Sequence, residues 1–217
     1  MSEFHLSSEP QVFKLGFDFE HQARSEGFTV IAGIDEVGRG CLAGPVVAAA
    51  CVLDLEKPLP KGLNDSKKLT AKQRGEIDDE LRATALSFAV GQIEADEIDQ
   101  INILQATIRA MAAAIGNLNP RPEFLLIDAV KLRDVAIPQK SIIKGDSISA
   151  SIAAASVIAK VFRDALMHDY HNTYPQYGFA EHVGYGTAAH FEALRVHGPC
   201  HLHRKTFRGV LPATQQT

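Results

Sequence analysis

The tightest limit on the fold of this chain comes from two apolar runs near its N-terminus. Residues 29–34 (TVIAGI) and 45–53 (PVVAAACVL) are mostly apolar at both odd and even positions. Such runs are typical of strands that are covered on both faces, so a sheet that contains them needs helices on each side. We therefore expect an α/β structure.

Further strands and helices are predicted along the rest of the chain. Thr70 and Gln73 fit a capping box and open a helix to about residue 82. Apolar residues spaced by three and four predict two more helices, and a last one stops at Gly198-Pro199. The expected strands are 29–34, 45–53, 87–93, 124–127 and 141–143, and the other expected helices are 101–115, 148–166 and 187–197.

Composition excludes several classes of protein. The chain has 217 residues, of which 46% are hydrophobic and 22% charged, which suits a globular protein with a full core. No stretch approaches the roughly 20 apolar residues of a membrane span, and the N-terminus has no signal-peptide pattern. The three cysteines are too scattered for a disulfide framework. These features favour a cytoplasmic protein without a membrane segment.

Charge is unevenly divided along the chain. Residues 1–128 carry 12 Lys and Arg against 20 Asp and Glu, whereas residues 129–217 carry 10 against 6 and seven of the nine histidines. Basic groups gathered on one face, or carboxylates holding metal ions, would let such a protein bind a polyanion. An uneven surface without function is the alternative. No histidine pair has a convincing zinc-finger spacing with cysteines, so we expect structural or phosphate-facing roles for them.

Carboxylates follow two of the predicted strands. Asp35 and Glu36 come after residues 29–34, and Asp128 follows residues 124–127. Asp146 immediately precedes the long helix predicted from residue 148. Ligand sites in open α/β sheets gather at the carboxyl ends of strands. If the two strands are neighbours, we expect these acids to lie together at one edge of the sheet.

Clustered carboxylates repel one another at neutral pH, and a proton or a hard cation relieves the repulsion. A set of Asp and Glu without His or Cys ligands favours Mg²⁺ or Mn²⁺ over Zn²⁺. Two such ions roughly 4 Å apart suit phosphodiester cleavage. Each acid also has a purely structural interpretation: Asp146 as a helix N-cap, Asp128 as the start of a turn, and Asp35-Glu36 as a polar strand end.

A glycine-rich segment, residues 38–44 (GRGCLAG), follows the first strand. Its spacing fits the dinucleotide-binding fingerprint poorly, because a strand rather than a helix is predicted after it. A tight turn between strands explains the glycines. They would also let the backbone approach a sugar–phosphate chain, with Arg39 presented to it. Both interpretations stay open.

At this point the motifs resemble a known family. Residues 33–40 (GIDEVGRG), with AGPV at 43–46, resemble the signature of type 2 ribonucleases H (ribonuclease HII). Four more segments agree in order: LNDSKKL at 63–69, LID at 126–128, KGD at 144–146 with the Ser- and Ala-rich stretch 149–160, and GYGT at 184–187 with His190. The resemblance spans about residues 17–210.

The resemblance implies a ribonuclease H-like fold, with a five-stranded mixed sheet flanked by helices and a C-terminal helical part. We expect one catalytic domain over residues 1–217, with an N-terminal extension to about residue 25 and the helical part from about residue 165. The resemblance implies an endonuclease that cuts the RNA strand of RNA–DNA hybrids and nicks 5′ of single ribonucleotides in duplex DNA. We expect a monomer, because nothing in the sequence requires more. The products would carry 3′-hydroxyl and 5′-phosphate ends.

The resemblance also assigns roles to residues. The acidic, metal-binding site would be Asp35, Glu36, Asp128 and Asp146. The substrate contacts would be Gly38, Arg39 and Gly40 on the ribose 2′-hydroxyl, Tyr185 on the next deoxyribose, and Ser66 with Lys67 or Lys68 on backbone phosphates. A bulky residue at Gly38 or Gly40 is therefore expected to damage activity more than folding.

One position departs from the family pattern. The family commonly has Lys where this chain has Val183, and His182 or Arg204-Lys205 are candidates to replace that contact. Two other functions remain as alternatives to a nuclease. One is a non-catalytic module that binds hybrids, against which all four acids argue. The other is a nucleotide-cofactor enzyme that uses the glycine segment.

Overall fold

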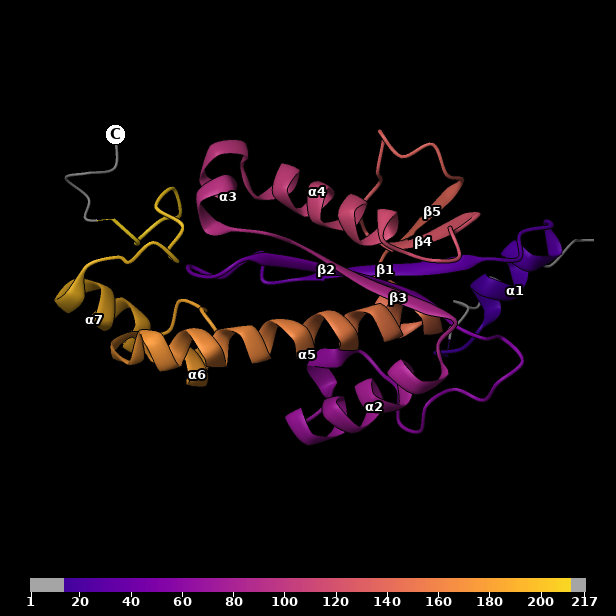
Figure 1. The fold of residues 1–217 in the computed structure, drawn as a ribbon, viewed down its shortest axis with the longest axis horizontal. Coiled ribbons are helices and arrows are strands. Elements are labelled where there is room, and N and C mark those ends of the chain that lie inside the picture. The colour runs from indigo at the N-terminus through magenta and orange to yellow at the C-terminus, as the bar shows by residue number, and fades with distance from the viewer. Residues whose placement is uncertain (1–13, 212–217) are drawn as a thin grey trace, which may run out of the picture.

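A five-stranded sheet forms the centre of the protein (Figure 1). The computed structural model describes residues 14–211, so parts of the expected N-terminal extension and C-terminal segment lie outside the described residues. In spatial order the strands are β3 (Ser87–Ile93), β2 (Val46–Val52), β1 (Ile31–Val37), β4 (Phe124–Asp128) and β5 (Gln139–Ile142).

The sheet is mixed. β1 pairs antiparallel with β2 and β2 antiparallel with β3, whereas β4 runs parallel to both β1 and β5. All five strands were predicted: β3 has its predicted bounds, the ends of β1 differ by two and three residues, and those of the other three strands by at most two. The mixed five-stranded sheet flanked by helices is therefore confirmed.

Helices cover both faces of the sheet, as the two-sided burial of β1 and β2 requires. α4 packs on β2 and β3 from one face, and α5 packs on β1 and β2 from the other, with α2 against α5 (Figure 1). The helices are α1 (Asp18–Ser25), α2 (Ala71–Thr84), α3 (Ala95–Ile101), α4 (Ile103–Gly116), α5 (Ala150–Thr173), α6 (Phe179–His182) and α7 (Ala188–His197). Short 3₁₀ turns lie at η1 (Ser66–Lys68), η2 (Gly145–Ser147) and η3 (Pro175–Tyr177).

The contact between β1 and α5 is unusually close. A Cβ built on Gly33 would lie 2.0 Å from the carbonyl carbon of Ser151, so only glycine fits there. The facing stretch of α5 is rich in buried Ala and Ser. These small residues bring α5 onto the strand that carries Asp35 and Glu36.

Two predicted helices differ from the structure. One helix was predicted over residues 101–115, and in the structure this helix is α4, which begins at Ile103. The preceding helix, α3, was not predicted. Asn102 separates them with a φ of 68°, and its side chain accepts hydrogen bonds from the backbone N–H groups of Leu104 and Gln105. α5 begins near the predicted residue but extends to Thr173. Within residues 14–211, no helix is both long and apolar enough to cross a membrane.

Candidate active site

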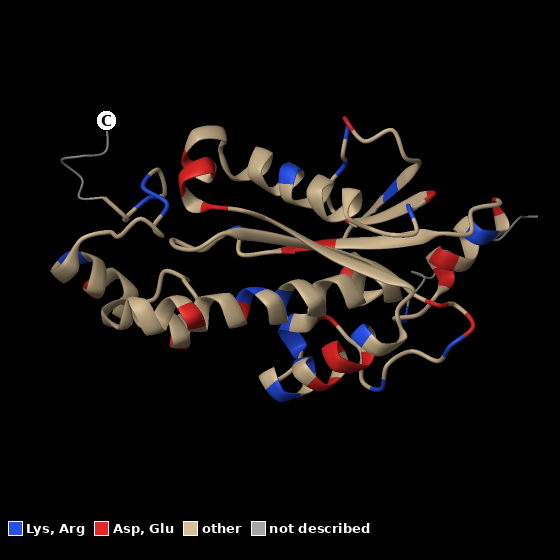
Figure 2. Ribbon diagram, viewed as in Figure 1, with Lys and Arg blue, Asp and Glu red and all other residues tan. Residues whose placement is uncertain are grey.

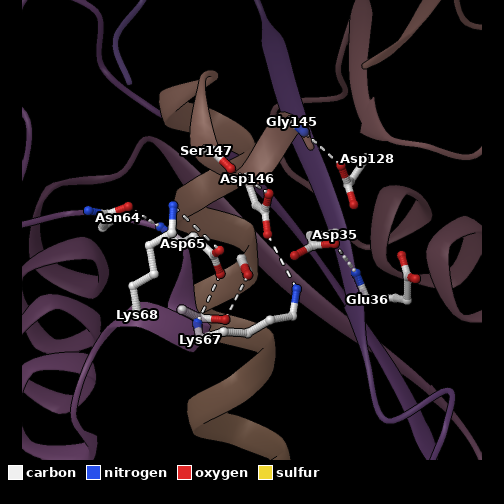
Figure 3. A network of polar contacts seen from close by, with 12 residues as sticks. Asp35, Glu36, Asn64, Asp65, Lys67, Lys68, Asp128, Gly145, Asp146 and Ser147 are labelled. Atoms are coloured by element: carbon white, nitrogen blue, oxygen red, sulfur yellow. Dashed lines mark hydrogen bonds and ion pairs between the residues drawn. The ribbon is translucent and has the colours of Figure 1, made fainter. Parts of the chain in front are cut away.

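Parallel pairing of β1 and β4 brings the predicted acids together. Ile34 pairs with Ile127, so Asp35 and Asp128 follow on neighbouring strands. Asp146 lies in η2, between β5 and α5. In Figure 3 the carboxylates of Asp35, Asp128 and Asp146 point toward a common space, with Glu36 beside it.

The structural alternatives for the acids fare differently. Ser149, not Asp146, caps α5, so the N-cap interpretation of Asp146 is wrong. Asp35 and Glu36 lie inside β1, paired with Ala49 and Ala48, and are not a frayed strand end. Asp128 does begin a tight turn, because its carbonyl accepts from the Val130 N–H at 2.6 Å, but its side chain still faces the other acids.

Burial makes the charged forms of these acids costly. Asp35 is 4% exposed, and burial, followed by repulsion from Glu36, raises its pKa well above the ordinary value. Burial also raises the pKa of Glu36, although the Arg39 guanidinium 3.1 Å from its Oε1 opposes this. The pKa of Asp128 is raised by burial against the effect of the Gly145 N–H, which donates to its Oδ1 at 2.7 Å. The site thus concentrates negative charge that the protein alone does not neutralise.

The donor set fits a hard divalent cation. It is made of carboxylate oxygens, and Oε2 of Glu36 is buried without a hydrogen-bond partner. A metal ion would satisfy that oxygen and offset the burial cost and the mutual repulsion that raise these pKa values. Among residues 14–211, however, no three such side chains already gather closely enough to hold an ion. Glu36 is turned to Arg39 and Asp128 to Gly145, so these side chains must adjust to share one.

Lys67 contacts the acid cluster through Asp146. Its Nζ lies 3.4 Å from Asp146 Oδ2, while 77% of its side chain remains exposed. Burial lowers the pKa of Lys67, but Asp146 and Asp35 outweigh this effect and raise it overall. Asp65 holds this turn by accepting from the Lys67 N–H at 3.0 Å.

Ser66 lies deeper than a phosphate contact requires. It is 4% exposed, and its hydroxyl is 2.9 Å from that of Ser156 on α5. Ser156 in turn forms a hydrogen bond that lowers the pKa of Asp35. Ser66 therefore fixes the turn behind Lys67, and Lys68 pairs at 3.9 Å with Asp65 rather than with the four acids.

The glycine segment is held by two arginines that are fully buried. Arg163 donates to the carbonyls of Pro45, Ala43 and Val183, and Arg204 donates to those of Gly44 and Arg39. Neither role is evident from the sequence, because no local pattern distinguishes an arginine buried against carbonyls from an exposed one. The pKa of Arg204 falls to about 10 by burial, which still leaves it charged at neutral pH.

Two expectations about this region are corrected. Arg204 and His182 are buried within the protein, so in this arrangement neither replaces the phosphate contact that the family commonly has near Val183. Gly38 has a φ of +90°, and a Cβ there would lie 2.3 Å from Nε of Arg163, so a substitution disturbs folding as well as activity. A Cβ built on Gly40 would meet no atom within 4 Å, which agrees with the expectation for folding.

Tyr185 lies in the turn before α7, with 43% of its surface exposed. Two buried histidines support its backbone: Nδ1 of His190 donates to the Tyr185 carbonyl at 2.9 Å, and Nε2 of His190 is 3.1 Å from Nε2 of His203. Nδ1 of His203 accepts from the Cys200 N–H at 3.0 Å, so its Nε2–H must donate to His190. This series of hydrogen bonds requires both imidazole rings to be neutral. Burial lowers the pKa of each, that of His203 to about 4.

Val183 has a strained backbone beside Tyr185. Its φ is 43°, which is rare for a β-branched residue, and its carbonyl is held by Arg163 at 2.8 Å. The turn before Tyr185 and the glycine segment thus share one buried guanidinium. This tie joins residues that lie more than a hundred positions apart in the sequence.

Comparisons with known proteins agree on one family. The family model described as Ribonuclease HII matches residues 32–210. A Ribonuclease HII of Chlamydia caviae is 56% identical over 203 residues, covering 93% of this chain and 95% of the relative.

Solved structures give the same result. The ribonuclease H2 of Pyrococcus horikoshii superposes with a TM-score of 0.69 at 25% identity, covering 84% of this chain and 95% of the other. The RNase HII in a complex with PCNA from Archaeoglobus fulgidus gives a TM-score of 0.71 at 26% identity, covering 83% and 96%.

Proposed function

The chain belongs to the ribonuclease HII family, whose members are metal-dependent endoribonucleases that cleave RNA in RNA–DNA hybrids, and from this premise we propose that it also nicks duplex DNA at single embedded ribonucleotides. The cut falls 5′ of the ribonucleotide and leaves 3′-hydroxyl and 5′-phosphate ends. The enzyme acts as a monomeric, single-domain protein of the cytoplasm.

The convergence of acids from β1, β4 and η2 is the observation that carries this proposal. Asp35, Glu36, Asp128 and Asp146 are the ligands for two divalent ions. The chemistry supplied by bound Mg²⁺ or Mn²⁺ is activation of a water and stabilisation of the departing oxygen. Lys67, exposed beside Asp146, contacts a backbone phosphate next to the cut.

Recognition of RNA is assigned to the glycine segment and to Tyr185. The 2′-hydroxyl is the local group that distinguishes RNA from DNA. The open space at Gly40 leaves room for a sugar to approach the backbone of Gly38-Arg39-Gly40. The exposed ring of Tyr185 packs on the following deoxyribose. Arg163 and Arg204 fix the positions of these parts without touching the substrate.

The test uses a labelled DNA duplex with one ribonucleotide and a matched duplex of DNA alone. Each is incubated with the protein and Mg²⁺, Mn²⁺ or a chelator. We expect a single nick 5′ of the ribonucleotide, only with metal, and a downstream product whose mobility changes after phosphatase treatment. Binding without nicking in every condition would instead support a hybrid-binding module. Nicking of the all-DNA duplex would refute the ribose assignment.

A further inference from the structure

A groove leads away from the acidic site between α4 and the connection from β4 to β5. It consists of two adjoining hollows, of about 600 and 460 Å³, which share Asp134 as a lining residue. Arg39 and Ala129 line the first hollow. Because Arg39 lies between Gly38 and Gly40, and Ala129 follows Asp128, the groove begins where the proposed cleavage site ends.

The groove carries positive charge from three separate parts of the chain, one of which is Arg121 in the lining of the second hollow. Arg39 comes from the glycine segment, and Lys131 and Arg133 come from the β4–β5 connection. Lys131 and Arg133 are exposed, and within residues 14–211 neither forms an ion pair. Asp134 is the one acid lining the two hollows. Figure 2 shows basic segments on this connection, beside α4.

The connection that presents these cations is held in place. Leu132 is fully buried between them, and the Gln139 side chain bonds both its N–H and its carbonyl at 2.8 Å. The Ser141 hydroxyl donates to the Val130 carbonyl at 2.6 Å. Ala129 adopts a φ of 51°, a conformation that costs free energy and often marks functional sites. Lys131 and Arg133 are thus positioned in advance of any ligand, which reduces the ordering cost of binding.

We propose that this groove binds the sugar–phosphate backbone of the duplex that flanks the cleavage position, through Lys131 and Arg133. The inference rests on the proposed function for its substrate. Its basis is charge complementarity and continuity with the acidic site, because the groove starts beside Asp128 and is lined by basic residues from there on. Phosphates on such a track add affinity without reading sequence.

The test compares two double variants. Lys131→Ala with Arg133→Ala removes the two cations that the β4–β5 connection contributes to the groove. Lys57→Ala with Lys61→Ala removes the same charge from the connection between β2 and α2, across the sheet from α4 (Figure 1). All four residues are exposed or nearly so, and thermal unfolding verifies that each variant is folded.

Binding is measured by fluorescence anisotropy in a chelator, over a series of salt concentrations. The probes are a long duplex with a central ribonucleotide and duplexes trimmed on one side or the other. For the long duplex we expect the groove variant to lose about tenfold in affinity at low salt and to reduce the salt slope by about two. Trimming one flank should shrink this loss, and the Lys57/Lys61 variant should match the wild type.

Two results would overturn the inference: a salt slope equal to that of the wild type, or an equal loss of affinity on all duplexes whatever their length. The second result would indicate that the residues act at the cleavage position itself. Failure of the proposed function is distinguishable, because the wild type would then not nick the ribonucleotide duplex with Mg²⁺ or Mn²⁺. The salt slope in chelator tests the groove in either case.

Discussion

Gly38 and Gly40 flank the same arginine but should respond very differently to an added methyl group. At Gly38 the backbone has a φ of +90°, which costs an L-residue about 1–2 kcal/mol. The new Cβ would also lie 2.3 Å from Nε of Arg163. That side chain is fully buried and bonded to three carbonyls, so it cannot swing away freely. Overpacking of this kind costs about 1–3 kcal/mol.

Together these effects predict that Gly38→Ala lowers the free energy of unfolding by about 2–5 kcal/mol. For a chain of this size that corresponds to a fall in melting temperature of about 10 °C. Gly40→Ala meets no atom within 4 Å and should change the unfolding free energy by no more than about 0.5 kcal/mol. Urea unfolding of both variants, with calorimetry as a second probe, measures the difference.

The two positions also separate folding from activity. Gly40→Val should unfold like the wild type yet nick a ribonucleotide duplex poorly, because its side chain would occupy the space assigned to the sugar. Equal stability of the Ala variants would refute the packing argument at Gly38. Normal nicking by Gly40→Val would refute the contact assigned to Gly40.

Three further predictions concern the acids, the histidines and the sheet. Asp35→Asn should abolish cleavage while leaving hybrid binding measurable, and unchanged cleavage would contradict its role as a metal ligand. In metal-free buffer at neutral pH the same variant should have a higher melting temperature, because the raised pKa of Asp35 means that its charge destabilises the fold. The pKa of His203 is about 4 in the folded protein and about 6.5 when unfolded. Neutral His203 therefore adds up to about 3 kcal/mol to the free energy of unfolding above pH 6.5, and this contribution is lost as the pH falls toward 4. Between pH 7.5 and 4.5 the unfolding free energy, measured with urea, should fall less in His203→Asn than in the wild type, and an equal fall would count against the neutral histidine pair. Gly33→Ala should lower the unfolding free energy by about 3 kcal/mol or more, since backbone of α5 occupies the space; a thermal shift near zero would show that α5 can move off β1.

Strands and most helices could be predicted because their signals are local. The two-sided apolar run of β2 and the capping box of Thr70 and Gln73 are complete within a few residues. The break at Asn102 could not be predicted in this way, because the apolar stripe depends on side chains and the break on a positive φ. Asp146 and Ser149 are both good N-cap residues, and only the path of the chain from β5 into α5 decides between them.

The acids of the candidate site could be predicted because strand ends and motif spacing bring them to one edge. The residues that hold these acids and the glycine segment in place could not be predicted. The position of Arg204 beside Lys205 suggests a surface cation, yet Arg204 is fully buried and donates to the Gly44 carbonyl, 160 residues earlier in the chain. In the sequence Ser156 is one of many small residues in a helix, and its contacts with Ser66 and Asp35 arise only from the fold. Such roles depend on long-range contacts that no local pattern encodes.

The hydrogen bonds from Arg163 to Ala43, Pro45 and Val183 have a consequence for selectivity. They hold the glycine segment and the turn before Tyr185 at a fixed distance from each other. In the proposed complex the glycine segment contacts the ribose and Tyr185 contacts the next sugar. A strand with a different spacing between its sugars would not fit both contacts at once, so the protein rejects it before cleavage begins.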